Sequence, residues 1–474
     1  MNFDLPVKLK PLILQLSEFS TSQGVKALLI GGFVRDIILK RPTKDIDIVL
    51  ESDCLKFTED FQKKYYPNNM VNYFKTYGVA QIKLDQVELQ FVTARKESYS
   101  YESRNPEVTQ GDFIDDQLRR DFTINCLALS LHADEYLKLI DPFNGINDLF
   151  YKTIKTPTNP EKTFSDDPLR MLRAIRFACQ LDFNIEPETF AAIVKMSPRL
   201  SIISKERISD EIQKIMNSPQ AARGWELLDQ AQLLKFILPE LLLLKGVENI
   251  DGIGHKDNFS HTLQVLHNVV QVSDDVWLRW ASLLHDIGKP RSKKFETNLG
   301  WTFHGHEVVG SKMVKHIFNN LKLPLHGPFF KVQKLISLHH RPISLTKENI
   351  TDSAVRRLIF DAGEDLEHLV LLCKADITTK NKEKLKRYQN NLDLVIKRIQ
   401  LVEDADKLRN WQPPITGEDI MKAFDLKPCK TVGIIKDAIR ESILDGKLAN
   451  NYHEAWNFML EKGTELGLKL CLEN

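Results

Sequence analysis

Short apolar runs separated by turns dominate the first 150 residues of the chain. One run ends at Gly31-Gly32, and the segment after it spaces its apolar side chains as a helix does. The next stretch alternates acidic and apolar residues with a period of two, which is typical of a strand with one buried face. The predicted strands are 25–30, 45–50, 79–84 and 87–92, with a helix at 33–40. We therefore predict an α+β domain around a small sheet.

Helical periodicity takes over after residue 150. Proline, serine or asparagine stands at the start of several segments, as is common at helix N-termini. The predicted helices include 168–183, 187–195, 204–217 and 219–234. Histidines gather in a stretch that opens near residue 249, and Trp411-Gln412-Pro413-Pro414 interrupts the last part. We predict four modules, 1–150, 151–245, 246–400 and 401–474, of which the last three are helical.

Two further segments have distinctive patterns. Residues 98–112 are polar and lack periodicity, so we expect an exposed loop there. The N-terminal run 1–19 is too short, and too often interrupted by Lys, Gln and Glu, for a signal peptide or a membrane span. We expect an amphipathic helix in its place and no membrane as a partner.

Composition narrows the class of protein only slightly. The 474 residues, with 42% hydrophobic and 27% charged side chains, fit a folded protein of several domains. The formal net charge of +1 means that overall basicity does not indicate a nucleic-acid partner, so any phosphate-binding surface must come from local clusters. The six cysteines are widely spaced and form no C-x-x-C pair, which favours reduced thiols and a cytoplasmic location.

The acidic strand carries the first candidate chemistry. Asp45 and Asp47 stand two residues apart, so their side chains point to the same face of the strand. Two adjacent carboxylates suit one or two Mg²⁺ ions, which bridge the phosphates of a nucleoside triphosphate and favour attack by a 3′-hydroxyl. Upstream, Gly31-Gly32 allows close approach of backbone to phosphate, and Arg35 adds a positive charge. Either motif alone is more commonly structural, but the combination predicts nucleotidyl transfer.

These motifs resemble those of a known family. Gly31-Gly32-Phe33-Val34-Arg35-Asp36 followed by Lys44-Asp45-Ile46-Asp47 is similar to the head domain of class II CCA-adding enzymes and bacterial poly(A) polymerases. The resemblance implies a polymerase-β-like head followed by a helical neck, a helical HD domain and a helical tail. Arg119 to Asn125 resembles the second motif of that family, which implies that Arg120 and Asn125 contact the incoming nucleotide, as do Gly32 and Arg35.

A third acid is common in polymerase β relatives. Glu88 lies on the predicted strand 87–92 and Asp85 just before it, so either side chain could reach the aspartate pair and act as this third acid. Each is more commonly a surface residue of a hairpin, so both stay outside the predicted catalytic pair of Asp45 and Asp47.

A basic stripe follows in the first predicted helix after the head. Asp167, Arg170, Arg173 and Arg176 fall along one helical face, for which a solvent-exposed stripe is the alternative. Asp167 can accept from an exocyclic amine while Arg170 donates, and this pattern distinguishes C and A from U and G. The segment resembles the E-D-x-x-R motif of the same family, with Asp166 where glutamate is usual. The resemblance implies that Arg173 and Arg176 bind phosphate.

Histidines and aspartates recur along the third module. Imidazole and carboxylate ligands suit transition metals such as Ni²⁺, Mn²⁺, Fe²⁺, Zn²⁺ or Co²⁺. The order resembles the HD phosphohydrolase superfamily, which implies that the metal ligands are His261, His285, Asp286, His306, His339 and Asp376. His304 and His340 remain alternatives to their neighbours His306 and His339. The implied activity is a 2′,3′-cyclic phosphodiesterase or phosphatase, and the resemblance leaves open whether the module is active.

The leading hypothesis is an enzyme that adds C, C and A to the tRNA 3′ end from CTP and ATP, with Mg²⁺ at the head. A poly(A) polymerase and an enzyme that adds only CC or only A remain alternatives, because the motifs do not determine when addition stops. An HD phosphohydrolase with a nucleotide-binding head is the alternative from another class. Two basic clusters are candidate RNA contacts, although solvated surface is as good an explanation: Lys374, Lys380, Lys382, Lys384, Lys386 and Arg387; and Lys427, Lys430, Lys436 and Arg440. The oligomeric state stays open.

Overall fold

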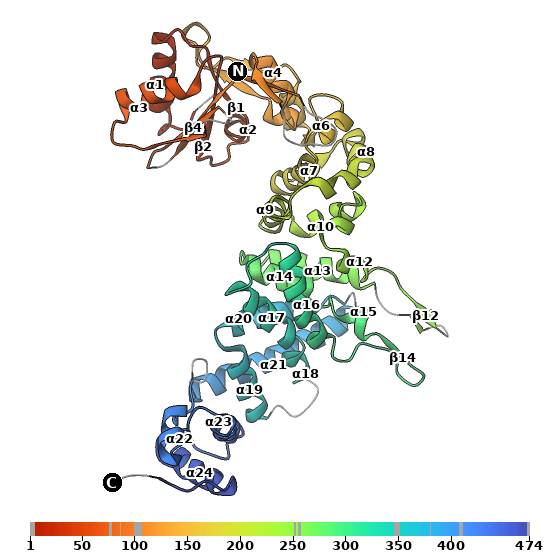
Figure 1. Ribbon diagram of the computed structural model, residues 1–474. Helices are drawn as coiled ribbons and strands as arrows, with labels where there is room; N and C mark the ends of the chain where they lie inside the picture. The colour runs from red at the N-terminus through yellow and green to blue at the C-terminus, as the bar shows by residue number, and fades with distance from the viewer. Residues whose placement is uncertain are drawn as a thin grey trace. The chain divides into compact units, whose positions relative to one another are not determined.

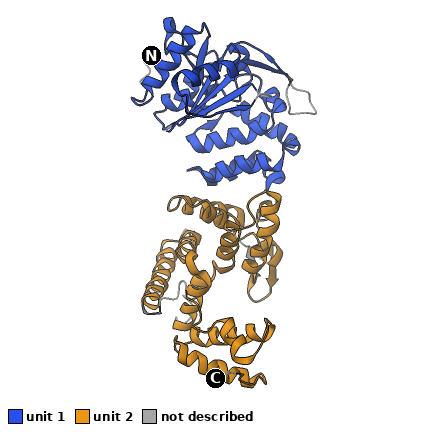
Figure 2. Ribbon diagram, turned by 60° about the vertical axis from the view of Figure 1, so that its left-hand side comes forward, with its two compact units in different colours: residues 1–239 blue, residues 240–474 orange. Residues whose placement is uncertain are grey.

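The protein is described here by a computed structural model with two compact units, residues 1–239 and 240–474 (Figure 2). The described residues are 5–74, 78–85, 87–98, 107–250, 253–254, 257–345, 351–379, 381–406 and 411–471. Among the described helices, none is both long and apolar enough to cross a membrane.

The first unit begins with an α+β head around a seven-stranded sheet of order β3-β4-β5-β2-β1-β8-β9 (Figure 1). Strand β2 pairs parallel to β5 and antiparallel to β1. The strands of the head are β1 Ala27–Ile30, β2 Asp45–Leu50, β3 Val71–Phe74, β4 Val79–Lys83, β5 Glu88–Thr93, β6 Arg95–Ser98, β7 Glu107–Gln110, β8 Ala128–Ser130 and β9 Leu139–Ile140. Its helices are α1 Lys10–Ser22, α2 Gly32–Ile38, α3 Cys54–Tyr65, α4 Phe113–Leu118 and α5 Gly145–Phe150, with 3₁₀ turns at Thr123–Asn125 and Ala133–Glu135. The predicted fold class is confirmed.

Strand β2 lies in the middle of the sheet, paired with β1 and β5, and its alternation places one face in the core. Ile46 and Ile48 are fully buried, whereas Asp45 is exposed and Asp47 is half-buried on the opposite face. In register, Asp47 lies beside Ile30 on one side and Gln90 on the other. The two aspartates therefore lie near the end of β1, where the chain turns into α2.

The rest of the first unit is helical. Its elements are α6 Pro160–Asp166, α7 Leu169–Leu181, α8 Pro187–Met196, α9 Lys205–Met216, α10 Ala221–Gln230, α11 Leu234–Ile237 and α12 Pro239–Leu242, which continues past residue 239, with a 3₁₀ turn at Ser197–Ile202. One short parallel pair, β10 Thr153–Ile154 with β11 Asn184–Ile185, departs from the prediction that strands end with the head. Helix α7 packs Met171, Leu172 and Ile175 into the core and leaves its arginines on another face.

Most of the second unit is helical. Its helices are α13 Asn258–Val270, α14 Val276–Leu284, α15 Lys289–Ser292, α16 His306–Asn320, α17 Pro328–Leu338, α18 Arg341–Ser344, α19 Asp352–Ala362, α20 Leu366–Asp376, α21 Lys382–Asp406, α22 Gly417–Phe424, α23 Lys430–Leu444 and α24 Tyr452–Glu465, with a 3₁₀ turn at Gly363–Asp365. Helices α22 to α24 pack around their own core of Ile420, Ile435 and Met459.

Two local predictions were wrong. The expected all-helical second half contains two hairpins, β12 Asn249–Ile250 with β13 Ile253–Gly254 and β14 Lys294–Glu296 with β15 Gly300–Thr302 (Figure 1). Within the expected loop 98–112, β7 pairs with β6, because a polar strand on a two-stranded ribbon needs no apolar period. Residues 99–106 of that loop lie outside the described residues. The expected N-terminal helix is present as α1, and it begins at Lys10 because Pro11 in its first turn favours a start there.

Candidate functional site

A cavity of about 780 Å³ in the first unit is lined by residues of both the head and helix α7. All ten residues that the sequence assigned to the head site and the basic stripe line this cavity. They are Gly32, Arg35, Asp45, Asp47, Arg120, Asn125, Asp167, Arg170, Arg173 and Arg176. The structure thus brings together motifs that are more than 100 residues apart in the chain.

The turn at the end of β1 brings backbone close to the aspartate pair. Gly31 has a φ of 78°, which L side chains rarely adopt. A Cβ at position 31 would lie 2.9 Å from Arg120 Nη1 and 3.4 Å from Asp47 Oδ2. Glycine is therefore required here for conformation and for space.

Asp45 and Asp47 bring two carboxylates together in the cavity. Burial raises the pKa of Asp47; Arg120 opposes this shift, and the nearby Asp45 carboxylate adds to it. A buried carboxylate beside a second one favours a bound proton or cation. Oxygen donors at this spacing suit Mg²⁺, so the residues present fit the divalent ion that the chemistry of nucleotidyl transfer uses.

Paired arginines lie beside the aspartates. Asp116, which has no exposed surface, accepts hydrogen bonds at 3.0 Å from Arg119 Nε and from Arg120 Nη2. Arg35 Nη1 donates to Asn125 Oδ1 at 2.7 Å. These contacts hold positive charge next to the acidic site in a fixed arrangement.

Residues that the motifs did not predict complete the cavity. They include Gln90, Arg95, Arg119, Asp121, Gln180, Arg207 and Lys214. Asp116 stands four residues before Arg120, so the i, i+4 pair is visible in the sequence, but its burial is not. Neither Glu88 nor Asp85 is among the described lining residues, and Gln90 faces Asp47 across the strand pair.

Asp167 lies in the bend between α6 and α7. Its Oδ1 accepts from the backbone N–H of Leu169 at 3.1 Å, and its Oδ2 lies 3.4 Å from Arg207 Nη2 on α9. The first bond orients the carboxylate at the start of α7. Arg170 donates to the Arg119 carbonyl at 2.6 Å, which ties α7 to the head.

The later arginines of the stripe are engaged with protein carboxylates. Arg173 Nε donates to Asp121 Oδ2 at 2.7 Å, and Arg176 Nη1 donates to Glu211 at 3.0 Å. Burial raises the pKa of Asp121, but Arg173 and a hydrogen bond from Asn125 outweigh burial and lower it to about 2. The alternative that these arginines only form a solvent-exposed stripe does not hold, because Arg170 and Arg176 are buried.

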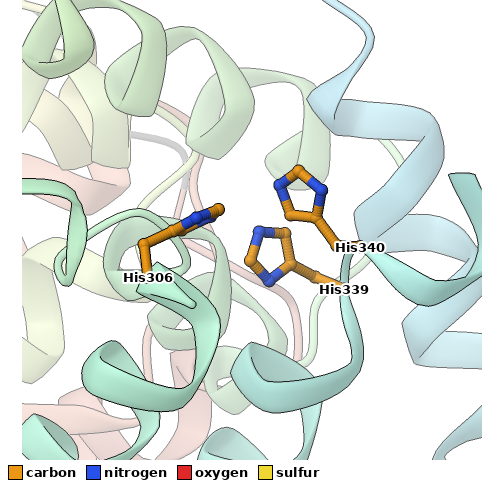
Figure 3. A group of neighbouring side chains, drawn as sticks. All are labelled: His306, His339 and His340. Atoms are coloured by element: carbon orange, nitrogen blue, oxygen red, sulfur yellow. The ribbon is translucent and has the colours of Figure 1, made fainter. Parts of the chain in front are cut away.

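A second candidate site gathers histidines and aspartates in the second unit. His306 projects toward His339 and His340, which follow α17 (Figure 3). His285 and Asp286 follow α14, and His261 and Asp376 approach from α13 and α20, with His261 Nε2 2.9 Å from Asp376 Oδ1. The structure thus brings together all six residues assigned to the HD module.

The histidines of this cluster share one orientation. The Nδ1 atoms of His285, His306 and His339 lie 2.7 to 2.8 Å from the carbonyl oxygens of Ser282, Phe303 and Ile336. A carbonyl only accepts, so each Nδ1 carries a proton, and each Nε2 is the atom that faces the other side chains of the cluster and would bind a metal. All three Nε2 atoms are buried and make no hydrogen bond within the described residues. Metal-binding histidines have this arrangement, so the cluster fits a transition metal.

The electrostatics of the cluster agree with a cation site. Burial lowers the pKa of His339 to about 3, so its imidazole is neutral at pH 7. Burial would also lower the pKa of His285, but Asp286, 3.3 Å away, and Asp376 raise it to about 10, so without a metal the His285 imidazole carries a second proton at pH 7, which a bound cation would displace. Of the alternative ligands, His304 is exposed, whereas His340 belongs to the cluster with His306 and His339.

Comparisons with known families match three parts of the chain. The Poly A polymerase head domain matches residues 27–155, and the probable RNA and SrmB-binding site of polymerase A matches residues 182–244. The HD domain family matches residues 258–411. These matches cover the sheet with its aspartates, the helices after α7 and the histidine cluster.

Individual relatives span most of the chain. The A-adding tRNA nucleotidyltransferase of Deinococcus radiodurans is 32% identical over 351 residues, covering 70% of this chain and 77% of that protein. The Multifunctional CCA protein of Shewanella frigidimarina is 30% identical over 379 residues, covering 74% and 84%. Among solved structures, the Thermotoga maritima CCA-adding enzyme complexed with tRNA has a TM-score of 0.61 at 19% identity, covering 98% of this chain and 96% of that one. At this identity the structural likeness shows the fold.

Proposed function

The chain belongs to the family of class II CCA-adding enzymes and poly(A) polymerases, and we propose that it adds C, C and A to tRNA 3′ ends from CTP and ATP. The observation that carries the proposal is the single cavity lined by Asp45, Asp47, Asp167 and Arg170. It joins groups suited to nucleotidyl transfer with groups suited to base selection. No nucleic-acid template is needed, because the protein itself presents the selecting groups.

In the proposed reaction, the primer's 3′-oxygen bonds to the α-phosphorus of the nucleotide while the bond from that phosphorus to the bridging oxygen breaks. Pyrophosphate leaves, and the hydroxyl proton passes to solvent. Asp45 and Asp47 would hold Mg²⁺, which supplies charge neutralisation and lowers the pKa of the hydroxyl. Arg120, fixed by Asp116, and Arg35, fixed by Asn125, lie where they can bind the triphosphate and sugar.

Base selection is assigned to Asp167 and Arg170. Asp167 lines the cavity, and its carboxylate can accept from the exocyclic amine of cytosine or adenine, which uracil and guanine do not present at that position. Arg170 has more donors than its bonds to the Arg119 and Thr163 carbonyls use, so it can also donate to the base. Arg173 and Arg176 keep their assignment to phosphate, with Asp121 and Glu211 holding them in place.

Asp167→Ala should weaken the choice of base more than the chemistry. Removing the acceptor takes away a contact that discriminates between bases by about 1 to 3 kcal/mol, which corresponds to about 5- to 150-fold in the ratio of CTP to UTP incorporation. The measurement is kcat/KM for each of the four nucleotides on tRNA lacking CCA. Arg223→Ala, on α10 and outside the cavity, is the control. Unchanged selectivity in Asp167→Ala would remove Asp167 from the assignment.

The product itself distinguishes the proposal from its alternatives. tRNA transcripts that end before CCA, after CC or with complete CCA are incubated with each nucleotide singly and together, and the products are sequenced. We expect C, C and A to be added and then addition to stop. Addition of A alone, as the name of the Deinococcus radiodurans relative indicates for that enzyme, or a long A tail would overturn the proposal.

We infer a second activity, metal-dependent hydrolysis of phosphate esters, at the histidine cluster. The support is the set of three buried Nε2 atoms that converge with Asp286 and Asp376. Ni²⁺, Mn²⁺, Fe²⁺ or Zn²⁺ would be held by these side chains together with His261, and when bound would acidify water. In the reaction, a water oxygen bonds to phosphorus, the ester P–O bond breaks, and the leaving oxygen takes up a proton. Cyclic 2′,3′-phosphates and terminal phosphates are the proposed substrates.

His339→Ala should abolish this hydrolysis and leave nucleotide addition unchanged. Loss of one ligand reduces metal affinity and activity by about 100-fold or more, since even changes around a ligand cost 10- to 100-fold. The measurements are bound metal per chain and hydrolysis of a 2′,3′-cyclic nucleotide with Ni²⁺, Mn²⁺ or Mg²⁺ added. His304→Ala, at the exposed neighbour of the cluster, is the control. If no metal supports hydrolysis in the wild type, the cluster has a structural or regulatory role.

The proposed partners are tRNA, ATP and CTP. We place the protein in the cytoplasm, where these substrates are found and where free thiols such as the buried Cys126, Cys179 and Cys373 stay reduced. The intact head cavity argues against an HD phosphohydrolase whose head only binds nucleotide.

A further inference from the structure

Strand β5 of the head presents one face to helix α3 and the other to the cavity of the first unit. Phe91 packs against Phe57 and Phe61 of α3, with ring centres 5.8 and 5.9 Å apart. Successive side chains of a strand point to opposite faces, so Gln90 and Val92 point away from α3, and both line the cavity. The cavity therefore extends from the acidic strand β2 across the open face of β5.

A row of side-chain amides crosses this open face, beginning beside Asp47. In register, Asp47 on β2 lies beside Gln90 on β5, and Gln90 lies beside Gln81 on β4. Gln81 Nε2 donates to Gln90 Oε1 at 3.2 Å. This bond uses the oxygen of the Gln90 amide, so its NH₂ group is free to donate to a ligand. Gln90 is thus an oriented donor one strand, about 5 Å, from the acidic pair.

Gln90 lies on the side of Asp47 that is left for the primer. The other side belongs to β1, where the turn at Gly31 and the Arg120 side chain lie next to Asp47 and where the triphosphate is proposed to bind. In phosphoryl transfer the attacking and leaving oxygens stand roughly in line, on opposite sides of the phosphorus. A pyrophosphate that leaves toward β1 therefore requires a primer 3′-oxygen that approaches over β5.

Apolar side chains lie next to Gln90 on the same face. Val92 stands two residues further along β5, in register with Val79 on β4 and Val49 on β2. All three valines line the cavity. An uncharged amide beside apolar surface suits the sugar and base of a nucleotide, whereas phosphates are usually bound by basic side chains. The group expected at Gln90 is therefore a ribose.

We propose that Gln90 binds the ribose of the primer's 3′-terminal nucleotide, with its amide donating to the 2′-hydroxyl while the adjacent 3′-oxygen lies at Asp45 and Asp47. Gln81 is a positioning residue, because it acts through Gln90. This contact rests on the nucleotidyl transfer proposed above and adds a property to it, the selection of RNA ends over DNA ends. The 2′-hydroxyl is the group by which a protein tells the two apart.

Two substrates and two proteins test the contact as a double-mutant cycle. The substrates are tRNAs lacking CCA that end in a ribose or in a 2′-deoxyribose. The proteins are the wild type and Gln90→Met, which keeps the length of the side chain without its amide. In single turnover the wild type should extend the ribose end faster by about 2- to 10-fold, the effect of one neutral hydrogen bond. Gln90→Met should extend both ends at the slower rate. Equal discrimination in the two proteins, or none in the wild type, would contradict the contact.

Two further variants separate this contact from a general defect of the sheet. Gln81→Met removes the bond that orients the Gln90 amide and should lower the discrimination part of the way. Asn72→Ala removes the exposed amide that follows Gln81 in register on β3 and does not line the cavity, so it should keep wild-type discrimination. If Asn72→Ala loses discrimination as Gln90→Met does, the effect comes from the sheet as a whole and the assignment to Gln90 fails.

The affinity for the incoming nucleotide distinguishes a primer contact from a nucleotide contact. Gln90→Met should leave the Kd for CTP, taken from the concentration dependence of single-turnover extension, unchanged. Weaker CTP affinity with undiminished discrimination of primer ends would assign Gln90 to the nucleotide and overturn the primer contact. Extension is measured with whichever nucleotides the wild type adds. A product other than CCA would thus overturn the proposed function and still test this contact, and a wild type that adds no nucleotide would overturn both.

Discussion

Asp45→Ala is expected to abolish the incorporation of every nucleotide, by about 10³-fold or more in kcat, in a protein that stays folded. Asp45 and Asp47 are the acidic pair of the cavity, and Asp47 already tends to take up a proton because it is buried beside Asp45. Without Asp45, the site loses one of the two carboxylates that would bind a divalent cation. The stabilisation of the transition state then falls by about 4 kcal/mol or more. The assay is single-turnover extension of tRNA lacking CCA, with CTP and ATP separately.

Glu88→Ala is the matched control for this experiment. Glu88 lies directly opposite Asp45 on the neighbouring strand β5, but it is not among the described residues that line the cavity. We expect nucleotide incorporation by Glu88→Ala to stay within a few-fold of the wild-type rate. A loss as large as that of Asp45→Ala would instead make Glu88 a third catalytic acid. Asp45→Ala with substantial residual activity would contradict the assignment of the pair.

Asp116→Ala is expected to give the largest loss of stability. Its carboxylate has no exposed surface, and burial raises its pKa, but the charges of Arg120 and Arg119 outweigh burial and lower the pKa. Removing it leaves two partly buried guanidinium groups without their shared anion, which costs about 3 to 5 kcal/mol. In a unit of this size the melting temperature should fall by about 10 °C. Differential scanning calorimetry of the full chain measures this shift.

Asp112→Ala provides the comparison on the same helix. Asp112 caps α4 by accepting from the N–H of Asp115 at 2.8 Å and is exposed. Loss of such a cap costs about 1 kcal/mol, so its melting temperature should fall by only a few degrees. Equal shifts in the two variants would show that burial of the Asp116 ion pairs contributes little. The two variants should also differ from each other in nucleotide binding, since only Asp116 orients Arg120.

Local sequence patterns were sufficient to predict the central strand β2 of the head and the turn from β1 into α2. A period of two placed Asp45 and Asp47 on one face of β2, and glycine at the end of β1 predicted the turn into α2. Both depend on residues that are neighbours in the chain, so backbone geometry alone decides them. The same local information misjudged β7, because pairing with β6 stabilises a strand that has no apolar face of its own.

Residue types and spacing determined by themselves that this protein carries an acidic strand after a glycine turn, a stripe of arginines on one helix, and recurring histidines. Only the tertiary structure decided which distant partners these groups meet: Asp121 with Arg173, Glu211 with Arg176, and the Arg119 carbonyl with Arg170. It also placed Gln90, and neither Glu88 nor Asp85, among the described residues that line the cavity with the aspartates. The physical reason is that burial and charge pairing join residues far apart in the chain, and their distances depend on how whole elements pack.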